Sequence, residues 1–292
     1  AGAFAGSPVQ PGCMCAFAPY DMENVKVVGF DIVTNRPKVA AYRAPGAPIS
    51  EYAVESVVDE IAEKLNMDPI ELRQKNAAKE GTRAAYGPKF GPIGYSEILD
   101  KAKAHEHYNT PLGPNQGRGV ASGFWFNAGG ESSAQVNVTE DGNVVVTTGH
   151  PDIGGSRAGI ANICAEILGI DYQRVSVLIG DTATIGFSNL TGGSRVLFAS
   201  SIVVTESTNK IIRTLCELAA KIWDIDPDAV NWENGEARPA GANAGKFPAL
   251  TLKELAARAN ESGGPIGEST QINTTGAEGG FGTHICDIEI DP

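Results

Sequence analysis

The stretch Thr191–Trp223, TGGSRVLFASSIVVTESTNKIIRTLCELAAKIW, places a glycine-rich tetrapeptide directly before a long helix that we expect from about Arg195 to Trp223. The same tetrapeptide, Gly-Gly-Ser-Arg, occurs again at Gly154–Arg157. There it precedes a second predicted helix, which ends at about Leu168. Two helix N-termini of this chain therefore begin with the same residues.

Each tetrapeptide has the composition of an anion-binding site. A helix start offers unpaired N–H groups and the positive end of the helix dipole. Glycines let a phosphate approach this backbone closely, serine adds a hydroxyl, and arginine adds a fixed charge. Two such sites suit a ligand with several phosphate or carbonyl acceptors, such as a dinucleotide.

A structural alternative exists for each copy of the tetrapeptide. Gly-Gly before a helix can be a tight turn, serine an ordinary helix cap, and arginine a solvated residue of the first turn. The duplication favours binding over this alternative. Neither copy contains the Gly-x-Gly-x-x-Gly of a dinucleotide-binding turn or the lysine of a P-loop, so the usual nucleotide motifs are absent.

The segments around the two tetrapeptides predict a mixed α+β fold. Strands and helices do not alternate with the regularity of a doubly wound parallel sheet. A turn around Asp141-Gly142 should join two antiparallel strands. The predicted strands are Gly117–Asn127, Gln135–Val138, Val144–Thr148, Arg174–Ile179, Ser269–Thr274 and Thr283–Ile290, and a further helix is expected over Leu252–Asn260.

The N-terminal part of the chain predicts one strand and two helices. Residues Asn24–Thr34 (NVKVVGFDIVT) alternate apolar and polar side chains, as in a strand. Apolar residues recur at helical spacing over Ser50–Asn66, and Asp68-Pro69 can cap and start the next helix. The glycine- and proline-rich stretch Pro111–Gly119 is the candidate boundary, which gives domains of residues 1–115 and 116–292.

Composition excludes several classes of partner. The formal charge of −12 argues against nucleic acid and against an anionic membrane surface, and no apolar run is long enough to span a bilayer. The five cysteines are an odd number without a disulfide framework, so we expect reduced thiols and a cytoplasmic location. Cys13 and Cys15 lack a second pair that would complete a metal site, so no side-chain metal ligand is predicted.

Two further residues are candidates for a ligand site. Arg43 lies in the loop Ala41–Gly46, where proline and glycine could hold it rigidly over an anion. An ordinary surface arginine explains the same pattern equally well. His150 precedes the first tetrapeptide and could act as an acid or base, although a polar loop histidine is the simpler interpretation.

Taken together, three segments resemble the molybdenum-binding subunit of the xanthine dehydrogenase and aldehyde oxidase family, the molybdenum hydroxylases. Lys38–Gly46 (KVAAYRAPG) is similar to the family's active-site loop, whose arginine lies close to molybdenum and substrate. Gly149–Gly154 (GHPDIG) resembles the segment that leads to a turn on the pterin. Thr191–Arg195 (TGGSR) resembles the turn that holds the pterin pyrophosphate. The similarity runs along nearly the whole chain.

This resemblance implies parts of two molybdopterin-binding domains, the first with the active-site loop. The cofactor would be molybdopterin, or its cytosine dinucleotide, with molybdenum; iron–sulfur clusters and FAD would lie on partner subunits. The enzyme would hydroxylate an aldehyde or an N-heterocyclic carbon with water, and Arg43 would be the catalytic residue. The residues that would bind the cofactor are Gly154, Gly155, Ser156, Arg157, Thr191, Gly192, Gly193, Ser194 and Arg195.

The sequence also departs from the family's pattern. Gly155 stands where the family normally supplies a glutamine, and Ala44 stands where the carbon monoxide dehydrogenase branch has a cysteine. The Gly-Glu segment that carries the family's general base is missing, so we expect a further chain of the molybdenum subunit to supply it. The alternative function is a non-catalytic binding or assembly module for a phosphorylated ligand.

Overall fold

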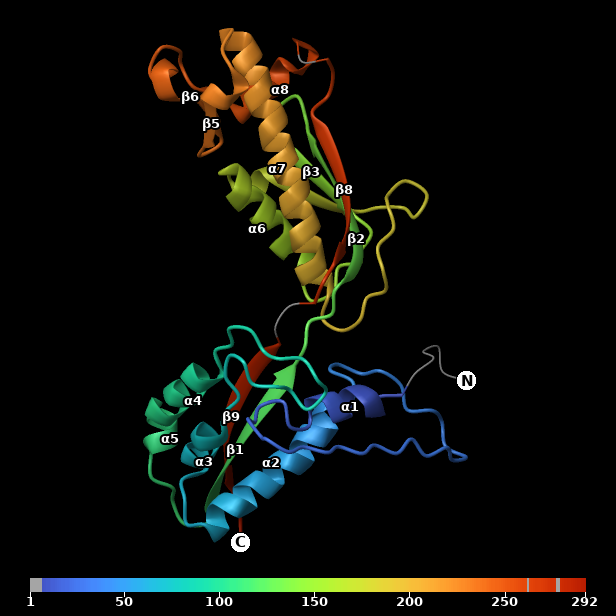
Figure 1. Cartoon of the computed structure of the whole chain (residues 1–292), viewed down its shortest axis with the longest axis vertical. Helices are drawn as coiled ribbons and strands as arrows, with labels where there is room; N and C mark the ends of the chain where they lie inside the picture. The colour runs from blue at the N-terminus through green and yellow to red at the C-terminus, as the bar shows by residue number, and fades with distance from the viewer. Residues whose placement is uncertain (1–6, 262, 277–278) are drawn as a thin grey trace. The chain divides into compact units, whose positions relative to one another are not determined.

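The computed structural model describes residues 7–261, 263–276 and 279–292 and divides the chain into two compact units. The second unit is Ala128–Ala277, and the first consists of the residues on either side of it (Figure 1). This division differs from the expected one at 115/116. The strand that begins at Gln116 pairs with the last strand of the chain, so both strands belong to the first unit.

The first unit is a two-stranded antiparallel ribbon with helices packed along it (Figure 1). Its elements are α1 (Val9–Cys15), α2 (Ala47–Lys64), α3 (Pro69–Asn76), α4 (Tyr95–Ala104), α5 (Glu106–Asn109), β1 (Gln116–Trp125) and β9 (Gly280–Glu289). The register of the ribbon pairs Gln116 with Glu289 and Trp125 with Gly280. Phe281 packs against Phe124 and Tyr95, with ring centroids 5.1 Å apart in both pairs.

Carboxylates of α2 hydrogen-bond to the edge of β1 that does not face β9. Three acidic residues, at positions i, i+4 and i+8 of the helix, accept backbone N–H groups of β1. Each carboxylate accepts from one strand residue, and these strand residues are two positions apart. The pairs are Glu51 with Phe124 (2.8 Å), Glu55 with Ser122 (2.6 Å) and Asp59 with Val120 (3.2 Å). The spacing of the carboxylates along α2 matches the spacing of the N–H groups along β1, because four helical residues rise about 6 Å and two strand residues about 6.8 Å. The helix thus accepts the N–H groups that a third strand would accept.

Arg73 of α3 lies fully buried beneath this row of carboxylates. Its Nε is 2.9 Å from Glu55, its guanidinium forms an ion pair of 2.8 Å with Asp59, and it donates to the carbonyl oxygen of Val120 at 2.7 Å. The Tyr20 hydroxyl also donates to Glu55. The buried charges are therefore paired, as a folded protein requires.

Glu51 makes the attachment of α2 to β1 dependent on pH. Burial raises the pKa of its carboxyl from 4.5 to about 7; Glu55 adds to this rise, and the N–H of Phe124 opposes it. The folded protein therefore keeps a proton that the unfolded chain has released. We expect the contribution of Glu51 to the stability of the first unit to be lost as pH rises from about 4.5 to about 7. The difference in urea stability between the parent protein and Glu51→Gln should therefore change across this range; a difference that stays constant with pH would contradict the assignment.

The predicted helix over Ser50–Asn66 is confirmed as α2, but it begins earlier than expected. Its N-cap is Gly46, with φ of +83°, and Ser50 lies inside the helix. The predicted helix after Asp68 is confirmed as α3, and the Asp68 carboxylate accepts the N–H of Glu71 at 2.8 Å.

Gly46 cannot accept a side chain. A Cβ there would lie against the carbonyl oxygen of Pro8 and 2.9 Å from the backbone nitrogen of Gly12. Gly81 has a similar φ of +85° but has open space around it. We expect Gly81→Ala to cost about 1–2 kcal/mol from backbone strain alone. Gly46→Ala should cost clearly more in thermal or urea denaturation; equal costs would show that the contact with α1 can relax.

The predicted strand Asn24–Thr34 is wrong. In the structure this segment is extended, but its backbone makes no strand pairing with the described residues. The alternating pattern is present without a neighbouring strand to receive its hydrogen bonds.

The second unit contains a four-stranded sheet covered by two helices (Figure 1). Its elements are β2 (Gly130–Val138), β3 (Val144–Thr148), α6 (Ser156–Leu168), β4 (Val175–Ile179), α7 (Val196–Trp223), β5 (Val230–Glu233), β6 (Glu236–Pro239), β7 (Leu250–Thr251), α8 (Leu252–Ala257) and β8 (Gly267–Thr274), with 3-10 turns at Tyr172–Arg174, Pro227–Ala229, Gly241–Asn243 and Ala259–Glu261. The sheet order is β4-β3-β2-β8, and only β3 and β4 run parallel. The strands β5, β6 and β7 form a separate small sheet.

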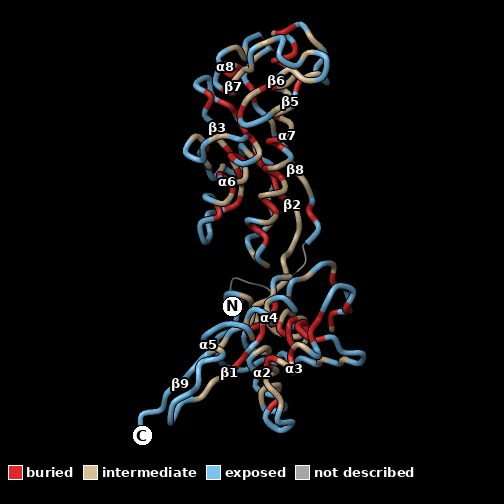
Figure 2. The backbone as a smooth tube through the Cα atoms, turned by 90° about the vertical axis from the view of Figure 1, so that its left-hand side faces the viewer, coloured by how far each residue is buried: buried red, intermediate tan, exposed pale blue. Residues whose placement is uncertain are grey.

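These elements confirm the α+β prediction. The turn at Gly142, with φ of +78°, joins β2 and β3, which are antiparallel as expected. Apolar residues of α6 and α7 pack on the sheet and form the core of the second unit, which is visible as buried segments in Figure 2. Among the described residues, no helix is long and apolar enough to cross a membrane.

Candidate functional site

The two Gly-Gly-Ser-Arg tetrapeptides lie at neighbouring helix starts in the second unit. Gly159, in the first turn of α6, packs so closely on α7 that a Cβ would lie 2.7 Å from Cδ1 of Leu197. Further along, Cys164 of α6 contacts Thr208 of α7 at 3.6 Å. The helices therefore run in the same direction with their N-termini side by side (Figure 1). The structure thus brings the two predicted tetrapeptides together.

The start of α6 already carries a carboxylate. Asp152 accepts the backbone N–H of Arg157 at 3.2 Å and the hydroxyl of Ser156 at 3.3 Å, and it pairs with Nε of Arg157 at 3.4 Å. Gly154 and Gly155 have φ of +65° and +80° and are open to solvent, with space beyond both Cα atoms. This start therefore offers accessible backbone, but a bound phosphate would meet the charge of Asp152.

The start of α7 has no such cap. Arg195 occupies the N-cap position without a side-chain hydrogen bond to the helix backbone, and the first turn contains no acidic residue. Ser194 and Thr191 are exposed, and Ser194 has φ of +57°. The first N–H groups of a helix have no partner within the helix. The α7 start is therefore the better of the two positions for an anion.

Arg195 itself does not face this position. Its side chain is 2% exposed, and its guanidinium donates to several protein acceptors. The acceptors are the carbonyl oxygens of Gly129 (2.6 Å), Glu131 (2.7 Å), Asn189 (3.0 Å) and Leu190 (3.3 Å) and the hydroxyl of Ser132 (3.0 Å). Arg195 uses these donors to hold the loop before α7 on β2.

His150 belongs to the same buried network. Its Nε2 lies 3.1 Å from the Ser132 hydroxyl and 3.4 Å from the Arg195 guanidinium. Burial, and then the nearby charge of Arg195, lowers the pKa of His150 to about 4. A neutral ring is therefore expected at neutral pH. His150 joins the segment before α6 to the loop before α7, a role that its position in a polar loop did not indicate.

Arg43 lies in the first unit, on a strained loop. Its side chain is exposed and makes no hydrogen bond or ion pair with the described residues. Ala44, the next residue, has φ of +52°, and Gly46 follows with φ of +83°. Left-handed conformations at a non-glycine residue cost energy and often occur at functional sites. The strain at Ala44 was not visible in the sequence.

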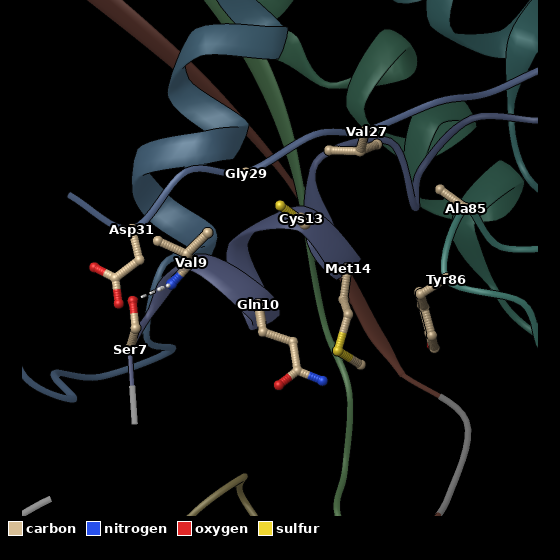
Figure 3. A pocket seen from close by; sticks show the side chains of 10 residues that line it. All are labelled: Ser7, Val9, Gln10, Cys13, Met14, Val27, Gly29, Asp31, Ala85 and Tyr86. Atoms are coloured by element: carbon tan, nitrogen blue, oxygen red, sulfur yellow. Dashed lines mark hydrogen bonds between the residues drawn. The ribbon is translucent and has the colours of Figure 1, made fainter. Parts of the chain in front are cut away.

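A separate cavity of about 590 Å³ lies in the first unit, between α1 and residues 27–31 (Figure 3). Cys13 and Met14 reach it from the helix and Asp31 from the extended segment. Cys15 is instead buried, which raises the pKa of its thiol to about 12, so the two cysteines of α1 do not share one environment. No cluster of three or more potential metal-ligating side chains exists among residues 7–261, 263–276 and 279–292.

Comparisons with known proteins agree with this arrangement. Two family models, each described as a molybdopterin cofactor-binding domain, match residues 93–292 and 1–77. The putative xanthine dehydrogenase molybdenum-binding subunit XdhA of Escherichia coli is 27% identical over 277 residues, 88% of this chain and 37% of that protein. The aldehyde oxidoreductase of Megalodesulfovibrio gigas is 29% identical over 216 residues, 68% of this chain and 23% of that protein.

Solved structures share the fold. Quinoline 2-oxidoreductase from Pseudomonas putida 86 gives a TM-score of 0.76 at 20% identity and covers 97% of this chain and 40% of that chain. Aldehyde oxidoreductase from Desulfovibrio gigas gives 0.74 at 22% identity and covers 97% of this chain and 31% of that chain. The chain thus spans less than half the length of these relatives.

Proposed function

This chain belongs to the molybdopterin cofactor-binding family, and from that premise we propose that it holds the molybdenum cofactor in an enzyme that hydroxylates an aldehyde or an N-heterocyclic carbon with water. The named relatives act as xanthine dehydrogenase subunits and aldehyde oxidoreductases. No observation favours the alternative of a non-catalytic binding module. The five cysteines are free, which suits the cytoplasmic location that we propose with it.

One observation carries this proposal: the uncapped start of α7 beside the open glycine backbone of α6. The unpaired N–H groups after Ser194 suit a pyrophosphate, in the molybdopterin or the cytosine dinucleotide form of the cofactor. Gly154 and Gly155 leave room for a flat pterin edge, and the carboxylate of Asp152 suits a pterin N–H donor better than a phosphate. The residues present therefore fit the cofactor.

The nine predicted cofactor residues divide into two groups under this proposal. Gly154, Gly155, Thr191, Gly192, Gly193 and Ser194 would contact the cofactor through backbone or hydroxyl groups. Ser156 and Arg157 would hold Asp152 in place, and Arg195 would hold the loop before α7 against β2. The chain then supplies shape and hydrogen bonds, whereas the bound cofactor supplies the redox chemistry.

Arg43 is the proposed catalytic residue. Its guanidinium would stabilise negative charge that develops on the substrate, because a fixed positive charge is most effective where charge appears in the transition state. Gly155 offers no side chain, so no residue of the α6 start would take part in this step. The general base and the iron–sulfur and FAD groups would belong to partner chains, including a further chain of the molybdenum subunit.

Ser194 gives a direct test of the anion position. Ser194→Asp places a carboxylate before the uncapped α7 start. Its negative charge interacts favourably with the helix dipole but repels a phosphate. We expect the variant to be at least as stable as the parent protein and to lose most of its molybdopterin, measured as oxidised pterin fluorescence per chain. Ser194→Asn has nearly the same shape without the charge and should keep the cofactor. Equal pterin in both variants would place the phosphate elsewhere.

A further inference from the structure

Three buried side chains connect the two helix starts to the sheet of the second unit. They are His150 from the segment before α6, Ser132 from β2 and Arg195 at the start of α7, and they are 2%, 0% and 2% exposed. Nε2 of His150 lies 3.1 Å from the Ser132 hydroxyl and 3.4 Å from the Arg195 guanidinium. The guanidinium also donates to the Ser132 hydroxyl at 3.0 Å. These side chains form a closed triangle, and His150 is its member on the α6 side.

The partners of Nε2 determine where the proton of the His150 ring lies. A guanidinium contains donors and no acceptor, so the ring nitrogen next to it must accept. The Ser132 oxygen accepts from Arg195 and can donate its own proton to the same nitrogen. A neutral histidine carries one ring proton, which therefore lies on Nδ1. The triangle is complete only while Nε2 is unprotonated.

A proton on Nε2 removes both hydrogen bonds of His150. The nitrogen can no longer accept, and its N–H points at an N–H of Arg195 that is 3.4 Å away. Two positive charges then lie together in a buried place, which is unfavourable. Burial, and then the charge of Arg195, accordingly lowers the pKa of His150 from 6.5 to about 4. Acid therefore favours a conformation in which the ring has left the triangle.

The acidic groups of the neighbouring segments have other partners. The Glu131 carboxylate of β2 accepts from the Asn189 side chain at 2.9 Å. The Asp152 carboxylate pairs with Arg157 at 3.4 Å. In the described part of the chain, no carboxylate forms an ion pair with His150, so a protonated ring has no compensating charge.

The residues on either side of the triangle belong to the proposed cofactor site. On one side, Asp152 at the start of α6 lies two residues after His150. On the other side, Arg195 holds the carbonyl oxygens of the loop that contains the second tetrapeptide. The segment and the loop also meet at Gly149, where a Cβ would lie 3.0 Å from Oγ of Ser188. Opening the triangle therefore frees the segment before α6 from the loop before α7.

We propose that His150 is a positioning residue for the molybdenum cofactor: its unprotonated Nε2 holds the loops before α6 and α7 together, and protonation of that nitrogen frees these loops and speeds release of the cofactor. A ligand held at two places dissociates slowly, because each bound end keeps the other at a high effective concentration. His150 maintains the spacing that the pterin end and the phosphate end both need. The inference rests on the proposed function, to which it adds a pH-dependent means of retention.

Two variants of His150 separate hydrogen-bond acceptance from titration. His150→Gln places an amide oxygen near the position of Nε2, where it accepts from Ser132 and Arg195 but does not titrate. His150→Leu fills a similar volume without an acceptor. His284→Gln is the matched control, because His284 is an exposed histidine of β9 in the first unit. Circular dichroism checks that each protein remains folded over the pH range used.

The measurement is the rate of pterin release from the assembled protein purified at neutral pH from its native host. Each preparation is transferred to buffers between pH 7.5 and 4.5, and the released pterin is measured by its fluorescence after oxidation. The closed triangle binds fewer protons than the open one, so acid favours the open state. We expect the release rate of the parent protein, relative to His150→Gln, to rise by up to about tenfold for each pH unit between 6.5 and about 4.

The variants give distinct expected results. The parent and His284→Gln should share the same pH profile, and His150→Gln should retain the pterin as well as the parent does at pH 7.5. His150→Leu should release it at least tenfold faster at pH 7.5, with no further rise in acid relative to His150→Gln. This rescue by glutamine distinguishes an accepting role from simple filling of space.

Two results overturn the inference. One is a constant ratio of the parent and His150→Gln release rates from pH 7.5 to 4.5. The other is equal retention of pterin by His150→Leu and the parent at pH 7.5. The pterin content before the pH change separates this failure from that of the proposed function. A parent protein that contains pterin but shows either result refutes only the role of His150, whereas an assembled parent protein without pterin refutes both.

Discussion

Arg195→Ala is expected to destabilise the second unit by about 2–3 kcal/mol, because it removes a buried guanidinium and leaves several partly buried carbonyl oxygens without their donor. Those carbonyls belong to Gly129 and Glu131 of the β2 side and to Asn189 and Leu190 of the loop before α7. The loss should appear in urea denaturation monitored by Trp223 or Trp232, which lie in this unit.

Arg157→Ala is the matched control, since it removes the same residue from the other copy of the same tetrapeptide. Arg157 is exposed and, among the described residues, pairs with Asp152; exposed ion pairs contribute little to stability. We expect a change within about 0.5 kcal/mol. If the two variants lost equal stability, the buried network around Arg195 would not have the structural role described above.

Arg43→Ala is expected to lower the turnover of the assembled enzyme by about 10²–10³-fold, the usual effect of removing one group that stabilises transition-state charge. The molybdenum content should not change, because Arg43 lies outside the unit that contains both helix starts. Steady-state kinetics with an aldehyde and with an N-heterocycle, together with metal analysis of the same preparation, measure both quantities.

The control for this variant is Arg213→Ala. Arg213 is also an exposed arginine, but it lies in the middle of α7, away from the helix start. It should leave turnover and metal content unchanged. Loss of molybdenum in Arg43→Ala would assign this arginine to cofactor binding, and unchanged turnover would remove it from the reaction.

The sequence predicted α2, α3, α6, α7 and α8 because their periodic or capping patterns are local, but it did not predict α1, α4 or the small sheet of β5, β6 and β7. The orientation of α2 could not be predicted in this way. The apolar stripe of a helix identifies one side, but the spacing of Glu51, Glu55 and Asp59 has meaning only beside β1, which begins at Gln116. Likewise, the alternating pattern of 24–34 predicted a strand, but a strand also needs a neighbour.

The compact units do not divide at the domain boundary expected from the sequence, for a related reason. Glycine and proline around Pro111–Gly119 mark a loop correctly, but a loop is not always a boundary between units. The pairing of β1 with β9 joins Gln116 to Glu289, and such long-range pairing leaves no local signal. The compact units therefore divide after Asn127.

The repeated tetrapeptide shows both the strength and the limit of a motif. It correctly predicted two helix starts, and the structure places them side by side. The sequences of the two copies are identical, yet their arginines differ. Arg157 is exposed and pairs with Asp152, whereas Arg195 is buried against β2. Neighbours from other segments decide this difference. The feature that makes the α7 start suitable for an anion is the lack of a capping side chain. No residue of the motif indicates this lack.

The central claim is that the adjacent starts of α6 and α7 hold a molybdenum cofactor. Molybdenum and pterin analysis of the chain, purified with its partners from the native host, tests it most directly. We expect both in equal and stoichiometric amounts, with the pterin lost in Ser194→Asp and kept in Ser194→Asn. A folded, fully assembled protein that contains neither molybdenum nor pterin would contradict the claim.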